Sequence, residues 1–320
     1  MLRAPMLRCG YPQAPTEKPD VVDQHGRFVW YELLTTDMAA ARAFYANVIG
    51  WEAQDASASD LAYSLFTAAR TPVSGLMELP EQARRMGATP RWVGYVSVNH
   101  VDATADLIRH LGGALYVPPT NSNIGRIAVV SDPQTATLAL VEGLKPCRHE
   151  TAEADEQGRV GWHELLAADW KKAFAFYGAL FGWQEAEAEV DPTNAYQLFS
   201  VGGQTIGGIL TKHPTEPVPF WLYYFNVVDL DVATERVKSD GGRIFEGPFE
   251  LPGGSWIARC IDPQGAMFAL QGQRSRDRIG KDPASEVGWS VAWGGFSSRG
   301  RLLVNQNSGS GRKPGSRGRD

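Results

Sequence analysis

The residues best suited to chemistry lie in a short pattern that occurs twice, a tryptophan followed two positions later by a glutamate. The first copy holds Trp30 and Glu32, and the second holds Trp162 and Glu164. Residues two apart in a strand share one face, so each glutamate is expected beside its tryptophan. Such a carboxylate can accept hydrogen bonds or face a cation in a small-molecule site. The alternative is structural, with the tryptophans in the core and the glutamates bound to backbone amides.

Later strands add side chains with the same orientation. Tyr95 and Ser97 join the first copy, and Asn226 and Gln271 make the second copy richer in polar groups. We therefore expect the second site to be the better one. No histidine pairs with a cysteine or serine at catalytic spacing, so no catalytic residue is predicted. The residues predicted to bind a ligand are Trp30, Glu32, Tyr95, Trp162, Glu164, Tyr224, Asn226 and Gln271.

These patterns belong to an internal repeat. Gly26–Glu52 and Gly158–Gln184 share WxELxxxD, an FY pair and a GW pair, 132 residues apart. The likeness continues through AYSLF and AYQLF, then WxxYxxV, and ends at a DPQ turn at Asp132 and Asp262. Two copies of one domain therefore follow each other.

Within the first copy, the periodicity predicts alternating strands and helices. Asp37 is expected to cap a helix that Gly50 ends, and a second helix is expected to end at Gly112. The expected elements are strand Phe28–Thr35, helix Met38–Ile49, strands near Ala62–Thr67 and Val73–Leu79, strand Trp92–Val98, helix Asp102–Leu111, and strands near Leu115–Val117, Arg126–Ser131 and Thr137–Val141. We predict an α+β fold of paired βαβββ modules, with a curved mixed sheet and helices on its outer face.

The repeat and the composition together predict how the chain divides into domains and linkers. The predicted division is a disordered segment over 1–25, domains over 26–143 and 158–273, a linker over 144–157 and a disordered tail over 274–320. The tail is rich in Gly, Ser and Arg and has ten Lys and Arg against four Asp and Glu, whereas the whole chain carries −5. We expect its removal after Gln273 to leave stability nearly unchanged, unless Trp289 or Trp293 docks onto a domain.

The same composition narrows the function classes. An acidic body does not favour nucleic acid as a partner, and no apolar run is long enough to span a membrane. Three scattered cysteines form neither a disulfide framework nor a zinc pattern. We expect a cytoplasmic monomer or homodimer whose partner is a small molecule.

The repeated motifs resemble the vicinal oxygen chelate superfamily, which contains glyoxalase I, bleomycin-resistance proteins and extradiol dioxygenases. The likeness covers about 26–273 and is greatest to bacterial glyoxalase-like proteins with tandem domains. It implies a divalent metal held from the first strand, from the strand that opens the second module, and from a Glu about seven residues after the DP turn. In this chain those positions hold Trp30, Val93 and Ala139, and then Trp162, Leu222 and Ala269.

Apolar side chains cannot bind such an ion, so no cofactor is predicted. The resemblance then favours a metal-free protein that binds a small molecule in one or both domains, as bleomycin-resistance proteins do. One alternative is a metal-dependent lyase or dioxygenase with relocated ligands. Another is a scaffold domain without a ligand.

Overall fold

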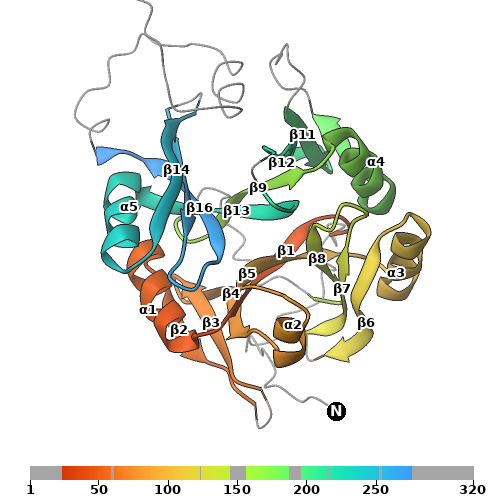
Figure 1. Ribbon diagram of the computed structural model, residues 1–320, viewed down its shortest axis with the longest axis horizontal. Coiled ribbons are helices and arrows are strands. Elements are labelled where there is room, and N and C mark those ends of the chain that lie inside the picture. The colour runs from red at the N-terminus through yellow and green to blue at the C-terminus, as the bar shows by residue number, and fades with distance from the viewer. Residues whose placement is uncertain are drawn as a thin grey trace, which may run out of the picture.

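The structure of the protein, a computed structural model, describes residues 24–58, 61–122, 124–144, 156–186, 196–214, 216–251 and 254–275. They form two eight-stranded sheets, one from each copy of the repeat (Figure 1). Domain 1 consists of β1 (Phe28–Thr35), α1 (Met38–Ile49), β2 (Glu52–Asp55), β3 (Tyr63–Ala68), β4 (Thr71–Glu78), α2 (Glu81–Arg85), β5 (Arg91–Ser97), α3 (Val101–His110), β6 (Ala114–Ser122), β7 (Gly125–Ser131) and β8 (Thr137–Glu142). Domain 2 consists of β9 (Val160–Ala167), α4 (Trp170–Phe181), β10 (Gln184–Ala186), β11 (Tyr196–Val201), β12 (Gln204–Thr211), β13 (Phe220–Asp229), α5 (Leu230–Ser239), β14 (Arg243–Glu250), β15 (Trp256–Ile261) and β16 (Met267–Gln273).

Each sheet is made of two equivalent halves. The strand order is β2-β3-β4-β1-β5-β8-β7-β6 in domain 1 and β10-β11-β12-β9-β13-β16-β15-β14 in domain 2. In domain 1 the central strands β1 and β5 are antiparallel, and each has a parallel outer neighbour, β4 or β8. The expected α+β fold with tandem mixed sheets is confirmed.

The first helix of each domain begins and ends as the sequence predicts. Asp37 caps α1 by accepting a hydrogen bond from the backbone amide of Ala40, and Gly50 ends the helix in the left-handed conformation at φ 87°. Asp169 and Gly182 do the same for α4. A residue with a Cβ would be strained at these two glycines. Each helix therefore stops where the chain must turn back to the edge strand.

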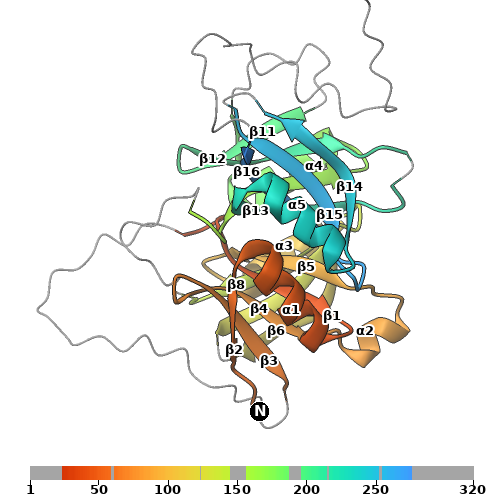
Figure 2. The same cartoon turned by 90° about the vertical axis from the view of Figure 1, so that its left-hand side faces the viewer.

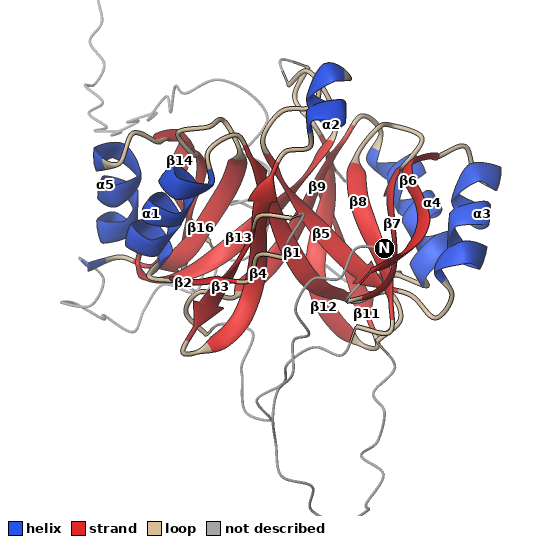
Figure 3. Cartoon of the chain, turned by 90° about the horizontal axis from the view of Figure 1, so that it is seen from below, coloured by secondary structure: helices blue, strands red, loops and turns tan. Residues whose placement is uncertain are grey.

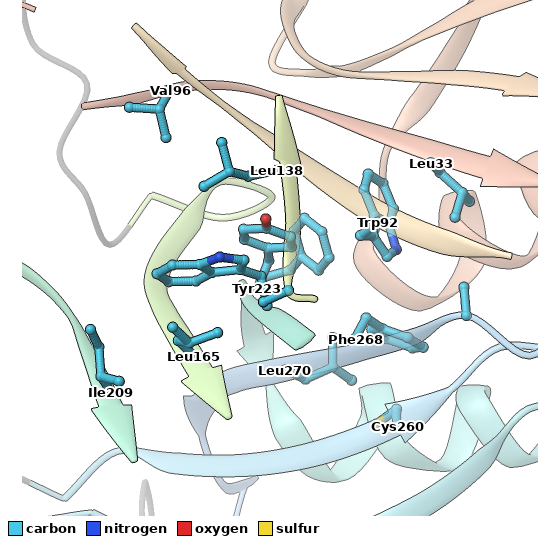
Figure 4. Close-up of a cluster of buried hydrophobic side chains, with 14 of the residues drawn as sticks. Leu33, Trp92, Val96, Leu138, Leu165, Ile209, Tyr223, Cys260, Phe268 and Leu270 are labelled. Carbon is cyan, nitrogen blue, oxygen red and sulfur yellow. The ribbon is translucent and has the colours of Figure 1, made fainter. Parts of the chain in front are cut away.

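The two domains pack through their helix-bearing faces. Helices α1 and α5 lie side by side at one end of the interface, and α3 and α4 lie side by side at the other (Figures 2 and 3). Between them a single cluster of buried side chains joins both sheets. In Figure 4, Leu33, Trp92 and Leu138 of domain 1 face Leu165 and Phe268 of domain 2. The fold thus has one large shared core between the domains.

The FY pair and the DPQ turn of the repeat meet across this interface. The Tyr45 hydroxyl donates to the Asp262 carboxylate at 3.0 Å, and the Tyr177 hydroxyl donates to Asp132 at 3.1 Å. Burial raises the pKa of both aspartates, although the hydrogen bonds that they accept lower it. The repeated motif therefore binds each domain to the other.

The GW pair makes a second reciprocal contact. The Trp51 indole donates to the carbonyl of Gly158 at 2.8 Å, and the Trp183 indole donates to the carbonyl of Gly26 at 2.8 Å. Each tryptophan thus holds the start of the other domain's first strand.

At three places in domain 1 the structure differs from the elements that were expected. The four-residue edge strand β2 was not predicted, because all of its residues are exposed and it has no apolar alternation. The short helix α2 was missed for the same reason, since none of its residues is buried. The strand expected near Leu115–Val117 is the longer β6, which forms an edge of the sheet and continues through two prolines.

Several predictions lie outside the described residues. They are the disordered segment over most of 1–25, the linker over 145–155, and the tail from 276 onward with Trp289 and Trp293. Arg274, at the expected start of the tail, forms an ion pair with Asp231 at 2.7 Å and lies over the ring of Trp256. No helix in the described ranges combines the length and apolar content needed to cross a lipid bilayer.

Candidate functional site

The face of each sheet turned away from the helices carries its own small apolar cluster, and we call these the inner faces. The inner face of domain 1 is formed by Trp30, Leu65, Val93, Tyr95, Ala139 and Val141. The inner face of domain 2 is formed by Leu166, Leu222, Tyr224, Ile257 and Ala269, with Trp162 packed against them. Most of the aromatic residues predicted to bind a ligand therefore lie on these faces.

The three metal-ligand positions implied by the resemblance come together on the inner face. In domain 1 they hold Trp30 on β1, Val93 on β5 and Ala139 on β8, all within one apolar cluster. The matching set in domain 2 is Trp162, Leu222 and Ala269. These side chains offer no imidazole, carboxylate or thiolate, so they do not fit a divalent metal. Among the described residues, no group of three His, Cys, Asp or Glu side chains could hold one.

Two glycines of the repeat make room for tyrosines on the inner faces. A Cβ at Gly75 would collide with the hydroxyl of Tyr63, and a Cβ at Gly208 would collide with the ring of Tyr196. Gly75 and Gly208 are the direct strand partners of Glu32 and Glu164. The glycines thus allow each tyrosine to lie across the sheet toward its glutamate.

Glu32 is held between two tyrosine hydroxyls. Tyr63 donates to one carboxylate oxygen at 2.8 Å, and Tyr95 donates to the other at 2.7 Å. Burial raises the pKa of Glu32, and these two hydrogen bonds oppose the rise without cancelling it. Burial and the adjacent Glu32 carboxylate raise the pKa of both tyrosines, so they remain neutral donors. The site is a desolvated acid among aromatic rings.

Glu164, unlike Glu32, forms a buried ion pair with an arginine. Tyr224 donates to Oε2 at 2.8 Å, as Tyr95 does to Glu32, but Arg259 also donates to Oε2 at 2.6 Å. Arg259 pairs with Glu246 as well, at 2.9 Å. Burial lowers the pKa of Arg259, but the nearby acidic groups raise it further, so the guanidinium stays charged. The carboxylate of Glu164 is therefore already neutralised by the protein.

The two repeats differ at both positions of the Arg259–Glu246 pair. Arg259 on β15 pairs across the strands with Glu246 on β14, and the matching cross-strand pair in domain 1 is Val129 with Val117. Arg259 and Val129 both stand three residues before the aspartate of the DPQ turn. The same sheet position thus carries an ion pair in one domain and two valines in the other.

Asn226 and Gln271 lie next to one another over Gly161, where a Cβ would collide with both side chains. The Asn226 amide donates to the backbone carbonyl of Glu156 at 3.1 Å. Asn226 therefore holds the chain just before β9. Ser97 has the matching position in domain 1, where its backbone bonds to Gly26 and Arg27. A ligand-binding role for Asn226 and Gln271 stays a prediction.

His163, between Trp162 and Glu164 in β9, faces the opposite side of the strand and is buried between the domains. Its two ring nitrogens contact the Tyr31 hydroxyl at 2.6 Å and the carbonyl of Ile206 at 2.7 Å. Burial lowers the pKa of His163 to about 4, although the carbonyl of Ile206 raises it. Since Nδ1 must donate to the carbonyl, Nε2 accepts from Tyr31 and the imidazole is neutral.

Sequence reasoning missed four residues of these sites, namely Tyr63, Tyr196, Glu246 and Arg259. The two tyrosines had a usable signal, because each AY pair is followed at the same spacing by a glycine, Gly75 in the first copy and Gly208 in the second. Arg259 had another, because it is the one charged residue in the apolar strand WIARCI. A buried arginine in such a strand needs a carboxylate partner.

The sequence profile described as the glyoxalase/bleomycin resistance protein/dioxygenase superfamily matches residues 27–140 and 159–270. The protein CFP32 of Mycobacterium tuberculosis, named as a candidate glyoxylase, is 31% identical over 246 residues, which cover 75% of this chain and 92% of CFP32. Both matches extend over the two domains.

Solved structures with related folds include two enzymes. The Mn(II)-bound glyoxalase from Novosphingobium aromaticivorans has a TM-score of 0.55 at 16% identity, covering 84% of this chain and 85% of the glyoxalase. The 2,3-dioxygenase LapB from Pseudomonas sp. KL28 has a TM-score of 0.56 at 12% identity, covering 83% and 98%. At such identities the likeness concerns the fold alone.

Proposed function

Because the chain belongs to the glyoxalase/bleomycin resistance protein/dioxygenase superfamily, we propose that it is a metal-independent member that binds a small molecule on the inner face of domain 1. The observation that carries this proposal is the placement of Glu32 between the hydroxyls of Tyr63 and Tyr95, beside the apolar positions where relatives would hold a metal. Aromatic walls with one well-placed polar group are typical of small-molecule sites.

Domain 1 is preferred over domain 2 because Glu32 has no cationic hydrogen-bond partner among the described residues and is less completely enclosed than Glu164. Glu32 is 8% exposed, whereas Glu164 is fully buried and bound to Arg259. Tyr95 is 5% exposed and its counterpart Tyr224 only 1%. This reverses the order of preference that the polar residues of domain 2 suggested from the sequence.

The aromatic residues suit a ligand with a flat or partly apolar body. Trp30 and Tyr95 provide ring surfaces on neighbouring strands, where they are direct partners. Such rings gain from stacking against another flat group in addition to the apolar area that they bury. A neutral planar amide such as benzamide is therefore a suitable first probe.

The test follows the indole N–H signal of Trp30 in the NMR spectrum while benzamide is added. We expect a saturable shift of this signal, identified by its loss in Trp30→Phe. Leu65→Trp should abolish the shift by filling the inner face of domain 1, whereas the matched Leu198→Trp in domain 2 should leave it intact. Absence of a benzamide shift at Trp30, or a shift that survives Leu65→Trp, would contradict the proposal.

Metal independence has its own measurement. Protein dialysed against buffer should contain well below one Fe, Mn, Ni or Zn ion per chain by elemental analysis. Treatment with EDTA should leave the benzamide titration unchanged. A stoichiometric metal that resists dialysis would instead support the metal-dependent lyase or dioxygenase.

A further inference from the structure

The two inner faces share four side chains and differ in one ion pair, that of Arg259 with Glu246. Trp30, Glu32, Tyr63 and Tyr95 of domain 1 match Trp162, Glu164, Tyr196 and Tyr224 of domain 2. Only domain 2 adds a guanidinium, that of Arg259, which contacts both the Glu164 carboxylate and the Tyr224 hydroxyl. Domain 2 thus shows, with its own side chain, which kind of group this arrangement of glutamate and tyrosine holds.

Domain 1 has the same glutamate and tyrosines but no arginine at the matching position. Val129 stands where domain 2 has Arg259, and it is only half-buried. Val117 replaces Glu246, so the second anchor of the guanidinium is also missing. We infer that the inner face of domain 1 binds an organic cation, an amidinium, guanidinium or ammonium group on an aromatic or apolar body, with Glu32 as its counter-ion. This inference rests on the proposed function and names the ligand class for that site.

The hydrogen-bond inventory agrees with a cation. Each tyrosine hydroxyl has one proton, and Tyr63 and Tyr95 both donate theirs to Glu32. What remains for a ligand is the acceptor capacity of these two hydroxyls and of the carboxylate, with one donor beside them, the Trp30 indole N–H, which has no hydrogen-bond partner among the described residues. Amidinium, guanidinium and ammonium groups carry donors only, so they suit the acceptors. A carboxylate ligand could accept from Trp30 but would meet the like charge of Glu32.

Electrostatics adds a driving force. The Glu32 carboxylate is desolvated and has no cation among its hydrogen-bond partners, so an incoming positive charge replaces lost solvation. The rings of Trp30 and Tyr95 lie on the same face and attract a cation through their π surfaces. Because burial raises the pKa of Glu32, cation binding should release protons and weaken as the pH falls.

Benzamidinium and benzamide test the charge preference, since they have nearly the same shape. By the Trp30 indole signal, benzamidinium should bind at least about tenfold more tightly than benzamide, or about 1.4 kcal/mol. Benzoate should bind more weakly than either. Glu32→Gln should remove the tenfold preference for benzamidinium over benzamide.

Exchange of residues between the domains is the decisive control. Val129→Arg places in domain 1 the side chain that domain 2 has, and it should abolish benzamidinium binding while the other indole signals keep their positions. Arg259→Val combined with Glu246→Val gives domain 2 the valine pair, and benzamidinium should then shift the Trp162 signal. Should the double variant fail to fold, Glu32→Gln and Val129→Arg still decide the question.

The outcomes separate the two proposals. Equal affinity for benzamidinium and benzamide at Trp30 would overturn the cation site and leave the small-molecule site standing. The same holds if Glu32→Gln binds benzamidinium as tightly as the wild type. Absence of any shift at Trp30 with either probe would reject both proposals.

Discussion

Glu32 and Glu164 occupy the same position in two sheets of the same topology, yet the protein stabilises them in different ways. Glu32 accepts two hydrogen bonds from neutral tyrosines and keeps a raised pKa, with 8% of its surface exposed. Glu164 is bound to the guanidinium of Arg259 and has no exposed surface. The difference follows from one cross-strand pair, which is Arg259 with Glu246 in domain 2 and Val129 with Val117 in domain 1.

The buried ion pair makes the stability of domain 2 depend on both of its partners. Burial of an ion pair costs desolvation free energy, which the contact between the two charges offsets. If one partner is removed, the other stays buried without a counter-ion, and this destabilises the protein more than a site that never contained the pair. Domain 1 does not have this dependence, because two tyrosine hydroxyls supply the hydrogen bonds that Glu32 accepts. We therefore expect matched substitutions in the two domains to have unequal effects.

The largest inequality should come from Arg259→Met. It leaves Glu164 buried without a counter-ion, and we expect a loss of about 3–5 kcal/mol in the free energy of unfolding. The matched Val129→Met in domain 1 should cost less than about 1.5 kcal/mol. Urea unfolding at pH 7.5 measures both. A loss below about 1 kcal/mol for Arg259→Met would show that the ion pair is dispensable.

At the interface domain 1 has Tyr31 where domain 2 has His163. The stability of the protein should therefore depend on pH through His163. The unfolded histidine takes up a proton near pH 6.5, whereas the folded His163 does so only at about 4. The contribution of His163 is therefore complete above pH 6.5 and decreases as the pH falls, by up to about 3 kcal/mol near pH 4. Urea midpoints of the wild type and His163→Gln between pH 7.5 and 4.5 should converge. Parallel pH profiles would contradict the buried neutral imidazole.

In contrast to the inner faces, the reciprocal tyrosines should behave alike. Tyr45→Phe and Tyr177→Phe each remove a hydrogen bond to a buried aspartate across the interface. We expect each to lower the free energy of unfolding by about 2 kcal/mol, since both leave a buried acceptor unsatisfied. Thermal or urea unfolding of the two variants tests the equality. A difference above about 1 kcal/mol would break the symmetry proposed for this interface.

The smallest effect concerns the glutamates themselves. Glu164→Gln weakens a charged hydrogen bond to Arg259 and should cost about 1–2 kcal/mol. Glu32→Gln should change stability by less than about 1 kcal/mol, because burial already disfavours the ionised form of Glu32 and glutamine has none. Both are measured by urea unfolding at pH 7.5. A marked loss for Glu32→Gln would assign Glu32 a structural role and remove it from the proposed site.

The internal repeat was sufficient to predict the fold, since helix α1, its Asp37 cap and its Gly50 stop coincide with the pattern. The edge strand β2 and the short helix α2 escaped because neither has a buried face, and periodicity reports only burial. Strand alternation also placed Glu32 and Tyr95 together correctly, as their hydrogen bond shows.

The contacts made by Arg259 could not be predicted from periodicity. Alternation places a residue on a face but does not tell that the long side chain of Arg259 reaches past two intervening strands, β16 and β13, to Glu164 on β9. The contact of Tyr45 with Asp262 was equally hidden, because it joins residues of different copies. A residue that is repeated in both copies is usually taken to be catalytic or to stabilise its own domain. The FY pair and the DPQ turn are repeated for another reason, because each contacts the other copy.

The reciprocal anchoring of Trp51 to Gly158 and of Trp183 to Gly26 has a consequence for cooperativity. Each domain contributes side chains to a core that the other completes, so we expect the two domains to unfold in one transition. Damage to the buried ion pair of domain 2 would therefore lower the temperature at which domain 1 loses its site. Ligand bound to domain 1 would in turn protect domain 2, because a ligand that binds only the native state stabilises the whole cooperative unit.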